Sequence, residues 1–317
     1  MLLVGCTEVL ELLEDPTGNT VYVPPKQDGF IDVSFCPSSN CSNSMLKVLE
    51  SASESIHCAL FDLRLDEIIN VLEEKSKKID VKVVIDNENE EHTSGKIYRY
   101  DTTSQYSHNK FCIIDGSIVT TGSFNPTERG NYKNNNNFLI IDSTFIAQNY
   151  EDEFIELWSG EFGKGGNQVE YPQIYLDGIS IETYFCPEDN CDLHLIDELR
   201  KATSSIYFMT FSFTHEEVAD EILYSKADIK GVFEKMQAGS KYSQFNRMKE
   251  FGLNVKKDNN SANMHHKVFI IDEKIVVTGS TNPSKSGFYK NDENMVIIED
   301  ESIASMFIEE FERVWET

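Results

Sequence analysis

The sequence predicts an α/β protein that contains two tandem copies of one domain. Its 317 residues fit two domains of about 130–150 residues each. A long stretch of the sequence recurs at a fixed interval, and short apolar runs alternate with amphipathic segments. Hydrophobic residues make up 40% of the chain, which is enough to build a core. Global disorder is therefore excluded.

The repeat is the strongest of these observations. Residues 106–115 (YSHNKFCIID) recur as residues 263–272 (NMHHKVFIID). The stretch VTTGSFNP is matched in the same way by VVTGSTNP, and the interval is 157 residues at both places. The interval between the two FCPxxNC segments is 150 residues, so the second copy carries seven more residues before its histidine motif. The chain is a duplication.

The elements of the first copy follow from their apolar patterns. A first strand is expected to end at Phe35, and helices are expected at residues 44–53 and 144–158. Further strands are predicted by short apolar runs, with a turn at Asp115 and Gly116. These runs are residues 55–60, 81–85, 110–114, 118–121 and 138–141. The second copy repeats the order, and the alternation predicts a sheet covered on both faces by helices.

Four segments are expected along the chain. They are an N-terminal segment at 1–30, the first copy at 31–160, a connection at 161–178 that contains Gly and Pro, and the second copy at 179–317. The sequence contains no run of about 18 apolar residues, so no membrane-spanning helix is predicted.

The charge of the chain restricts its partners. There are 54 acidic residues against 28 Lys and Arg, for a formal net charge of −26. Such a chain does not attract polyanions over a long range. An anionic substrate must therefore be bound by a local cluster of positive groups.

The cysteines and the N-terminus favour a protein outside the cytoplasm. Cys36 with Cys41, and Cys186 with Cys191, have the spacing of small disulfide loops, although reduced thiols and a four-thiolate metal site are alternatives. Cys58 and Cys112 lie in apolar runs and are expected to be small core residues.

Two further features bear on location. Residues 3–6 (LVGC) resemble the end of a lipoprotein signal, but the apolar stretch that a complete signal needs is missing. Asn-x-Ser sequons occur at Asn40 and Asn259. We expect an extracytoplasmic or cell-surface protein with a possible lipid anchor, and a cytoplasmic protein is the alternative.

The repeated histidine motif carries the chemistry. Because side chains alternate along a strand, His108 and Lys110 point to the same face. Ser123 and Asn125 follow on a tight turn that begins at a glycine. An imidazole beside an ammonium and an amide suits a phosphate oxyanion, with a nucleophile or proton carrier at hand. The second copy repeats the whole set as His265, Lys267, Ser280 and Asn282.

His-x-Lys-x-x-x-x-Asp followed by Gly-Ser-x-Asn, present twice, resembles the phospholipase D superfamily over residues 31–317. The resemblance implies two tandem α-β-α sandwich domains with pseudo-twofold symmetry and one shared active site. It also implies phosphodiester cleavage through a covalent phosphohistidine, with no cofactor and no obligatory metal.

The resemblance further implies a role for each motif residue. One of His108 and His265 attacks phosphorus, and the other protonates the leaving oxygen. The phosphate oxygens are bound by Lys110, Lys267, Asn125 and Asn282, with Ser123 and Ser280 supporting the pocket. Asp115 and Asp272 complete the two catalytic motifs, and their expected role is to order the strand ends.

In the family, a carboxylate or amide after Gly-Ser-x-Asn holds each catalytic imidazole. At this register the first copy has Asn136 and the second has Glu293. An amide partner leaves an imidazole neutral and nucleophilic, whereas a carboxylate partner favours an imidazolium. With each residue orienting the histidine of its own copy, His108 is predicted to be the nucleophile and His265 the general acid.

The substrate is less well determined. A nuclease acting on DNA or RNA, with single strands favoured, is the first hypothesis, because residues 230–257 combine lysines with aromatic side chains. An ordinary helix with a solvated basic face would explain the same stretch. A phospholipase D or a phosphatidyl transferase resembling cardiolipin synthase is the alternative enzyme, and a non-catalytic phosphate-binding or nucleic-acid-binding protein is the alternative of another class. A monomer with two pseudo-symmetric halves is expected, or a dimer of it.

Overall fold

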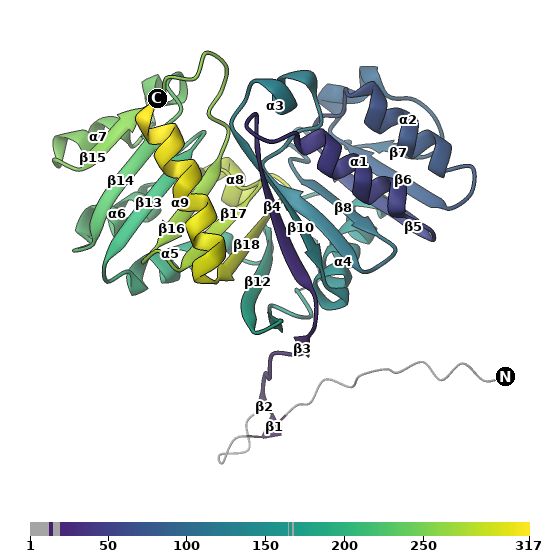
Figure 1. The fold of residues 1–317 in the computed structure, drawn as a ribbon, viewed down its shortest axis with the longest axis horizontal. Coiled ribbons are helices and arrows are strands. Elements are labelled where there is room, and N and C mark those ends of the chain that lie inside the picture. The colour runs from purple at the N-terminus through teal and green to yellow at the C-terminus, as the bar shows by residue number, and fades with distance from the viewer. Residues whose placement is uncertain (1–12, 15–19, 164, 167) are drawn as a thin grey trace.

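A computed structural model describes the chain except for residues 1–12, 15–19, 164 and 167. Each copy of the repeat folds around its own mixed β-sheet, and the two sheets lie side by side with helices on their faces (Figure 1). The motif at residues 3–6 lies outside the described residues. Among the described residues, no helix is long and apolar enough to cross a membrane.

The first sheet has seven strands in the order β4-β10-β9-β8-β5-β6-β7. Two helices cover one face and α4 covers the other, because alternate residues of each strand face opposite clusters of apolar side chains. The strands are β4 (Phe30–Cys36), β5 (Ser55–Leu60), β6 (Asp80–Ile85), β7 (Tyr98–Tyr100), β8 (Lys110–Ile114), β9 (Ile118–Gly122) and β10 (Asn136–Asp142). The helices are α1 (Cys41–Ser51), α2 (Asp66–Lys75), η1 (Asn87–His92), α3 (Glu128–Tyr132) and α4 (Thr144–Ser159).

The second sheet repeats this topology and adds two edge strands, in the order β15-β14-β13-β16-β17-β18-β12-β11-β3. Its strands are β3 (Lys26–Gln27), β11 (Gln173–Leu176), β12 (Ile179–Cys186), β13 (Ser205–Thr210), β14 (Asp228–Phe233), β15 (Asn254–Lys257), β16 (Lys267–Ile271), β17 (Ile275–Gly279) and β18 (Glu293–Glu299). Its helices are α5 (Cys191–Lys201), α6 (Glu216–Tyr224), η2 (Gln237–Gly239), α7 (Phe245–Glu250), α8 (Lys285–Tyr289) and α9 (Glu301–Glu316). Outside both sheets, β1 (Leu13–Glu14) pairs with β2 (Thr20–Val21).

The two halves share one hydrophobic core. Tyr150 on α4 of the first half packs edge-on against Phe185 on β12 of the second, with ring centroids 5.0 Å apart. Phe307 on α9 makes the reciprocal contact with Phe35 on β4, also at 5.0 Å. Each long helix therefore packs across the boundary onto the other half, which gives the molecule its pseudo-twofold arrangement and fixes the two sheets relative to each other.

The elements differ from the predictions at a few places. Helix α1 begins at Cys41, three residues earlier than expected, because the Asn40 side chain accepts a hydrogen bond from the Asn43 N–H and caps the helix. Residues in the expected connection form β11, and residues in the expected N-terminal segment form β3, which pairs with β11 in parallel. Both segments thus extend the second sheet.

Three disulfides pair the six cysteines that the structure describes. Cys36–Cys41 and Cys186–Cys191 close the two small loops that the spacing predicts. Cys58 and Cys112 are buried, as expected, but the prediction that they are simple core residues was wrong, because they form a third disulfide. They lie directly opposite each other on the antiparallel strands β5 and β8, with Cα atoms 4.0 Å apart. The pairing of these strands, which brings the two thiols together, is a tertiary contact that their spacing does not reveal.

Candidate active site

The two histidine motifs meet at the boundary between the halves. His108 and His265 stand just before β8 and β16, and both are buried. The His108 N–H donates to the Asp292 carbonyl in the second half, and the His265 N–H donates to the Asn135 carbonyl in the first, both at 2.9 Å. Each motif is thus held by the backbone of the opposite half, and the duplication produces one site instead of two.

The orienting side chains also cross between the halves. Glu293 Oε2 lies 2.7 Å from His108 Nδ1, and Asn136 Oδ1 lies 2.9 Å from His265 Nδ1. The Ser123 carbonyl is a second acceptor, 3.1 Å from His265 Nδ1. The prediction that each residue orients the histidine of its own copy was therefore wrong. The reason is the pseudo-twofold packing, which places the start of β18 against the first motif and the start of β10 against the second.

These contacts fix the tautomer of both rings. An acceptor at Nδ1 keeps a proton on that nitrogen and leaves the lone pair on Nε2. Burial, followed by the charges of Lys110 and Lys267, lowers the pKa of His108 well below its ordinary value. Burial and the same two lysines also lower the pKa of His265. Both imidazoles are therefore neutral before an anion binds.

The two lysines of the motifs are buried beside the histidines. Lys110 Nζ donates to the His108 carbonyl at 2.5 Å, and Lys267 Nζ donates to the His265 carbonyl at 2.9 Å. Burial lowers the pKa of Lys110 to about 7 and lowers the pKa of Lys267 well below its ordinary value. Burial raises the pKa of Glu293 to about 7. A bound phosphodiester would supply the negative charge that these ammonium groups need.

Two aromatic residues belong to the site although the sequence analysis did not identify them. The ring of Phe61 contacts His108 edge-on at 4.8 Å and lies under Lys110 at 5.2 Å. Phe211 contacts His265 at 4.8 Å and lies under Lys267 at 5.0 Å. The repeat could have revealed both residues, because the two phenylalanines are separated by the same 150 residues as the cysteine pairs.

The Gly-Ser-x-Asn turns supply two kinds of group. Ser123 Oγ accepts the Asn137 N–H at 3.0 Å, and Ser280 Oγ accepts the Asn294 N–H at 2.9 Å, so the serines brace β10 and β18. The side-chain oxygens of Asn125 and Asn282 are buried and have no hydrogen-bond partner among the described residues. Buried polar groups that the fold leaves without a partner are rare, and these two oxygens are open to a hydrogen-bond donor.

The motif aspartates lie elsewhere. Asp115 follows the far end of β8, about 16 Å along the strand from Lys110. Its carboxylate accepts hydrogen bonds from the N–H groups of residues 53–55. Asp272 accepts the corresponding bonds from residues 203–205. The structure does not bring Asp115 or Asp272 to the histidines, and both instead hold the turn that enters the neighbouring strand.

A cavity of about 540 Å³ opens beside the second Gly-Ser-x-Asn turn. Its lining includes Lys241, Arg247 and Lys285, with the exposed ring of Tyr242. The other basic residues of 230–257 lie apart from it: Lys230 covers the Tyr207 ring, and Lys256 covers the ring of Trp315. Among the described residues of that stretch, only Phe245–Glu250 is α-helical, so one continuous basic helix does not form.

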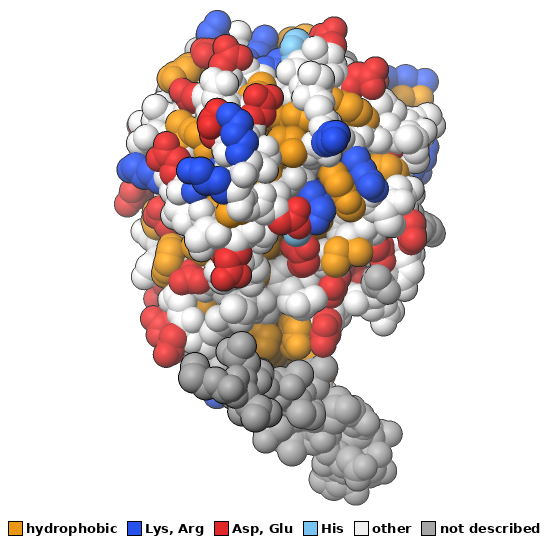
Figure 2. Space-filling view, turned by 90° about the vertical axis from the view of Figure 1, so that its right-hand side faces the viewer, with side chains coloured by type: hydrophobic (Ala, Val, Ile, Leu, Met, Phe, Trp, Pro, Cys, Tyr) orange, Lys and Arg blue, Asp and Glu red, His pale blue; other side chains and the backbone are white. Residues whose placement is uncertain are grey.

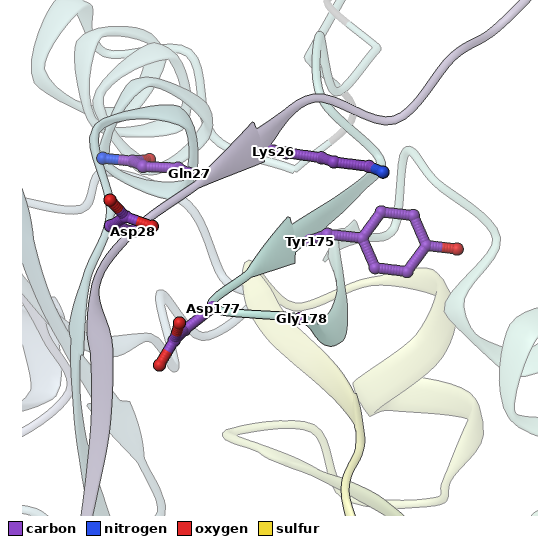
Figure 3. A pocket seen from close by; sticks show the side chains of 6 residues that line it. All are labelled: Lys26, Gln27, Asp28, Tyr175, Asp177 and Gly178. Carbon is purple, nitrogen blue, oxygen red and sulfur yellow. The ribbon is translucent and has the colours of Figure 1, made fainter.

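A second hollow lies away from the histidines. It is lined by residues of β3 and β11, and Figure 3 shows Lys26 lying alongside the Tyr175 ring while Asp28 and Asp177 point elsewhere. It adjoins the Ile179 end of β12, whereas Cys186 at the other end pairs with Glu293. The length of β12 separates it from the site.

The chain matches the family described as "Cardiolipin synthase, PLD-like domain" over residues 45–158 and 195–315. It is 33% identical over 129 residues to the mitochondrial cardiolipin hydrolase of Canis lupus familiaris, a match that covers 38% of this chain and 49% of that protein. It is 25% identical over 189 residues to a phospholipase D of Rickettsia prowazekii, covering 55% of this chain and 91% of the relative.

Among solved structures, phosphatidylserine synthase from Haemophilus influenzae has the same overall fold. The TM-score is 0.66 at 12% identity, over 90% of this chain and 86% of that one. The chain belongs to the phospholipase D superfamily and has two PLD-like halves. It spans about half the length of the cardiolipin hydrolase that it matches.

Proposed function

We propose that the protein is a metal-independent nuclease that cleaves single-stranded DNA or RNA through a phosphohistidine at His108. The observation that carries the proposal is the crossed pair of buried imidazoles, each beside the buried lysine of its own motif. In neither ring does Nε2 form a hydrogen bond with another described residue. Applied to these crossed pairs, the argument used for the sequence would exchange the two roles, so it no longer supports His108 as the nucleophile. We assign the attack to His108 on a different ground, the positive charge that its ring acquires. Its partner is the carboxylate, not the amide.

The Glu293 carboxylate supports attack by His108. When Nε2 forms a bond to phosphorus, the ring becomes positively charged, and a carboxylate 2.7 Å from Nδ1 stabilises that charge. The P–O bond to the leaving group breaks as the P–N bond forms. Lys110 and Lys267 offset the charge that builds on the phosphoryl oxygens, and the side-chain N–H groups of Asn125 and Asn282 donate to those oxygens in this proposal.

His265 is the proton carrier. Once the phosphodiester anion raises its pKa, His265 Nε2 carries the proton that the leaving oxygen takes up. Its Nδ1 partners, the Asn136 amide and the Ser123 carbonyl, are neutral and hold an imidazolium less tightly than a carboxylate would. In the second step His265 removes a proton from water, the water oxygen bonds to phosphorus, and the P–N bond breaks to release a phosphomonoester.

The substrate class is inferred from the rim of the site. Lys241 and Lys285 lie beside the second phosphate-binding turn, next to the exposed Tyr242 ring. Arg247 lines the same cavity but pairs with Asp220, and Glu216 is an acidic residue of the lining. Lysines beside an aromatic face suit a nucleic-acid strand, because the charges bind phosphates and a base can stack on the ring. At the 157-residue interval, Lys285 corresponds to Glu128, so the two rims differ in charge. Acidic and basic side chains are interspersed on the surface of the first half (Figure 2).

A phospholipid is the second candidate substrate. Two of the relatives favour a phospholipid substrate, because they are named as a cardiolipin hydrolase and a phospholipase D. The catalytic residues would be the same, because both substrates are phosphodiesters.

The test compares both substrates in EDTA. The protein is incubated with labelled single-stranded and double-stranded DNA, with single-stranded RNA, and with vesicles of cardiolipin or phosphatidylcholine, and H108A serves as the inactive control. We expect cleavage of single strands that K241E slows at least tenfold, while K47E on the exposed face of α1 has no effect. Cleavage of lipid alone would refute the nuclease proposal and leave the phosphodiesterase chemistry standing.

A further inference from the structure

Two consecutive residues of β18 contact two consecutive residues of the first histidine motif across the boundary between the halves. Glu293 Oε2 lies 2.7 Å from His108 Nδ1, and Asn294 Nδ2 donates to Asn109 Oδ1 at 2.8 Å. Because the side chains of an extended chain alternate, a shift of β18 by one residue would break both contacts. The Asn294 amide therefore fixes the register in which Glu293 meets His108.

The Asn294 side chain is fully buried, and both of its polar atoms have partners. The oxygen accepts the Thr121 hydroxyl at 2.6 Å and the Tyr150 hydroxyl at 3.3 Å. The nitrogen donates to Asn109 and, at 3.4 Å, to Ser280 Oγ. An amide has two acceptor and two donor positions, so this set uses the capacity of the side chain. Three of the four partners belong to the first half, and a buried polar network that is satisfied in this way holds one arrangement of the two halves.

The corresponding side chain of β10 has longer contacts. Asn137 lies 157 residues before Asn294, and its oxygen accepts the Thr278 hydroxyl at 3.2 Å. Its nitrogen lies 3.3 Å from His266 Nδ1. The residue that corresponds to the tyrosine beside Asn294 is Phe307, which has no hydroxyl to donate. The shorter contacts therefore belong to the strand that carries the carboxylate, not to the strand that carries the orienting amide.

We propose that Thr121 is a positioning residue for the reaction: by holding the Asn294 amide, it keeps the Glu293 carboxylate on Nδ1 of His108. Thr121 lies near the end of β9 and is fully buried. Its hydroxyl donates to Asn294, so it acts through this amide and not on the phosphate. The inference rests on the proposed attack by His108, and it is the same for a nucleic-acid and a lipid substrate.

The effect of Thr121 should appear in the chemical step and not in substrate binding. The Glu293 carboxylate stabilises the charge that the His108 ring acquires as the bond to phosphorus forms, and this benefit depends on accurate placement. In T121V the Asn294 amide loses its shortest hydrogen bond, while valine keeps a similar shape. We expect kcat to fall about tenfold and KM to stay within twofold, because the interaction is made in the transition state. T121S keeps the hydroxyl and should restore most of the lost activity.

The assay is hydrolysis of bis-p-nitrophenyl phosphate in EDTA by the wild type, T121V, E293Q and the double variant T121V/E293Q. If Thr121 acts through Glu293, its hydroxyl should matter little once the carboxylate is gone, so we expect T121V to cost less than twofold in the E293Q background. Y150F removes a hydroxyl from the same amide and introduces the residue type that the second half has there, so it decides the test if T121V does not fold. It should lower kcat about threefold in the wild type and not in E293Q.

The matched control is T183V on β12. The Thr183 hydroxyl is buried and accepts a hydrogen bond from the Asn149 side chain of α4 at 2.8 Å, across the same boundary. T183V should lower the midpoint of urea unfolding about as much as T121V does, because each variant loses one buried hydrogen bond between the halves. It should leave kcat unchanged, because its partner does not adjoin a residue that orients a histidine.

An equal loss of kcat in T183V, or full activity of both T121V and Y150F, would overturn the proposal. A loss in T121V that multiplies with the loss in E293Q would also overturn it, because Thr121 would then not act through Glu293. H108A or E293Q as fast as the wild type would instead refute the proposed chemistry at His108, and the inference with it. A slow E293Q beside a fully active T121V would remove the inference alone.

Discussion

Replacing Glu293 by Gln tests whether the carboxylate of the second half activates the histidine of the first. The carboxylate lies 2.7 Å from His108 Nδ1 and is fully buried. With about 4 Å between the carboxylate and the centre of a charged ring, and an effective dielectric constant of about 20, the attraction is at most about 4 kcal/mol. Part of it is retained by the amide hydrogen bond, so we expect a net loss of about 2–4 kcal/mol in transition-state stabilisation. This corresponds to a decrease in kcat/KM of about 30- to 1000-fold.

The assay is hydrolysis of bis-p-nitrophenyl phosphate, which does not depend on how a natural substrate binds. In the wild type, kcat/KM should rise with pH as the Glu293 carboxyl group loses its proton near pH 7. It should fall again as the Lys110 ammonium group loses its proton near the same pH. In E293Q the acidic limb of this profile should disappear. The matched control is E310Q, which removes the carboxylate of another buried His–Glu pair, His266–Glu310, outside the site. Activity of E293Q within threefold of the wild type, or an equal loss in E310Q, would refute the reasoning.

Three further predictions follow from the same structure. The protein should remain active in EDTA at a temperature where circular dichroism shows that it is folded, because the groups proposed to act on the phosphate are imidazoles and lysines. An activity that EDTA abolishes and that zinc or magnesium restores would contradict this prediction. D272N should lower the stability by about 1–3 kcal/mol in urea unfolding and leave kcat/KM unchanged, because Asp272 holds the N–H groups of residues 203–205. Burial opposes ionisation of Asp272, but the hydrogen bonds from these residues outweigh it and lower the pKa of the carboxyl group. The stability that Asp272 adds should therefore be present above pH 4 and be lost as the pH falls further. Non-reducing peptide mapping of protein from its native host should show three disulfides, including Cys58–Cys112; free thiols at all six positions would argue against a location outside the cytoplasm.

Much of the fold could be predicted from the sequence because the same pattern of strands and helices occurs in both copies of the repeat. The strands at Lys110–Ile114 and Ser55–Leu60 agree with their predicted bounds, since each is a short, mainly apolar run. The histidines and lysines of the two motifs were identified from the pattern of the sequence, and the contacts across the boundary bring the two motifs together. Asp115 and Asp272 belong to the same motif but lie at the other end of the strand.

The contacts between the halves could not be predicted in the same way. The partner of His108 is 185 residues away in the sequence, and a repeat does not show whether its copies contact each other within or across the boundary. The third disulfide depends in the same way on the pairing of β5 with β8. Each of these features is a tertiary contact without a local sequence signal.

The central claim is that His108 forms the covalent intermediate in a site shared by both halves. The most direct measurement is mass spectrometry of H265A quenched at alkaline pH after reaction with bis-p-nitrophenyl phosphate in EDTA. The good leaving group allows the first step without a general acid, and the missing base slows hydrolysis of the adduct. We predict a phosphoryl adduct on His108 in H265A and none on any histidine in H108A. An adduct on His265 in H108A, or no adduct in either variant while the wild type turns over, would contradict the account.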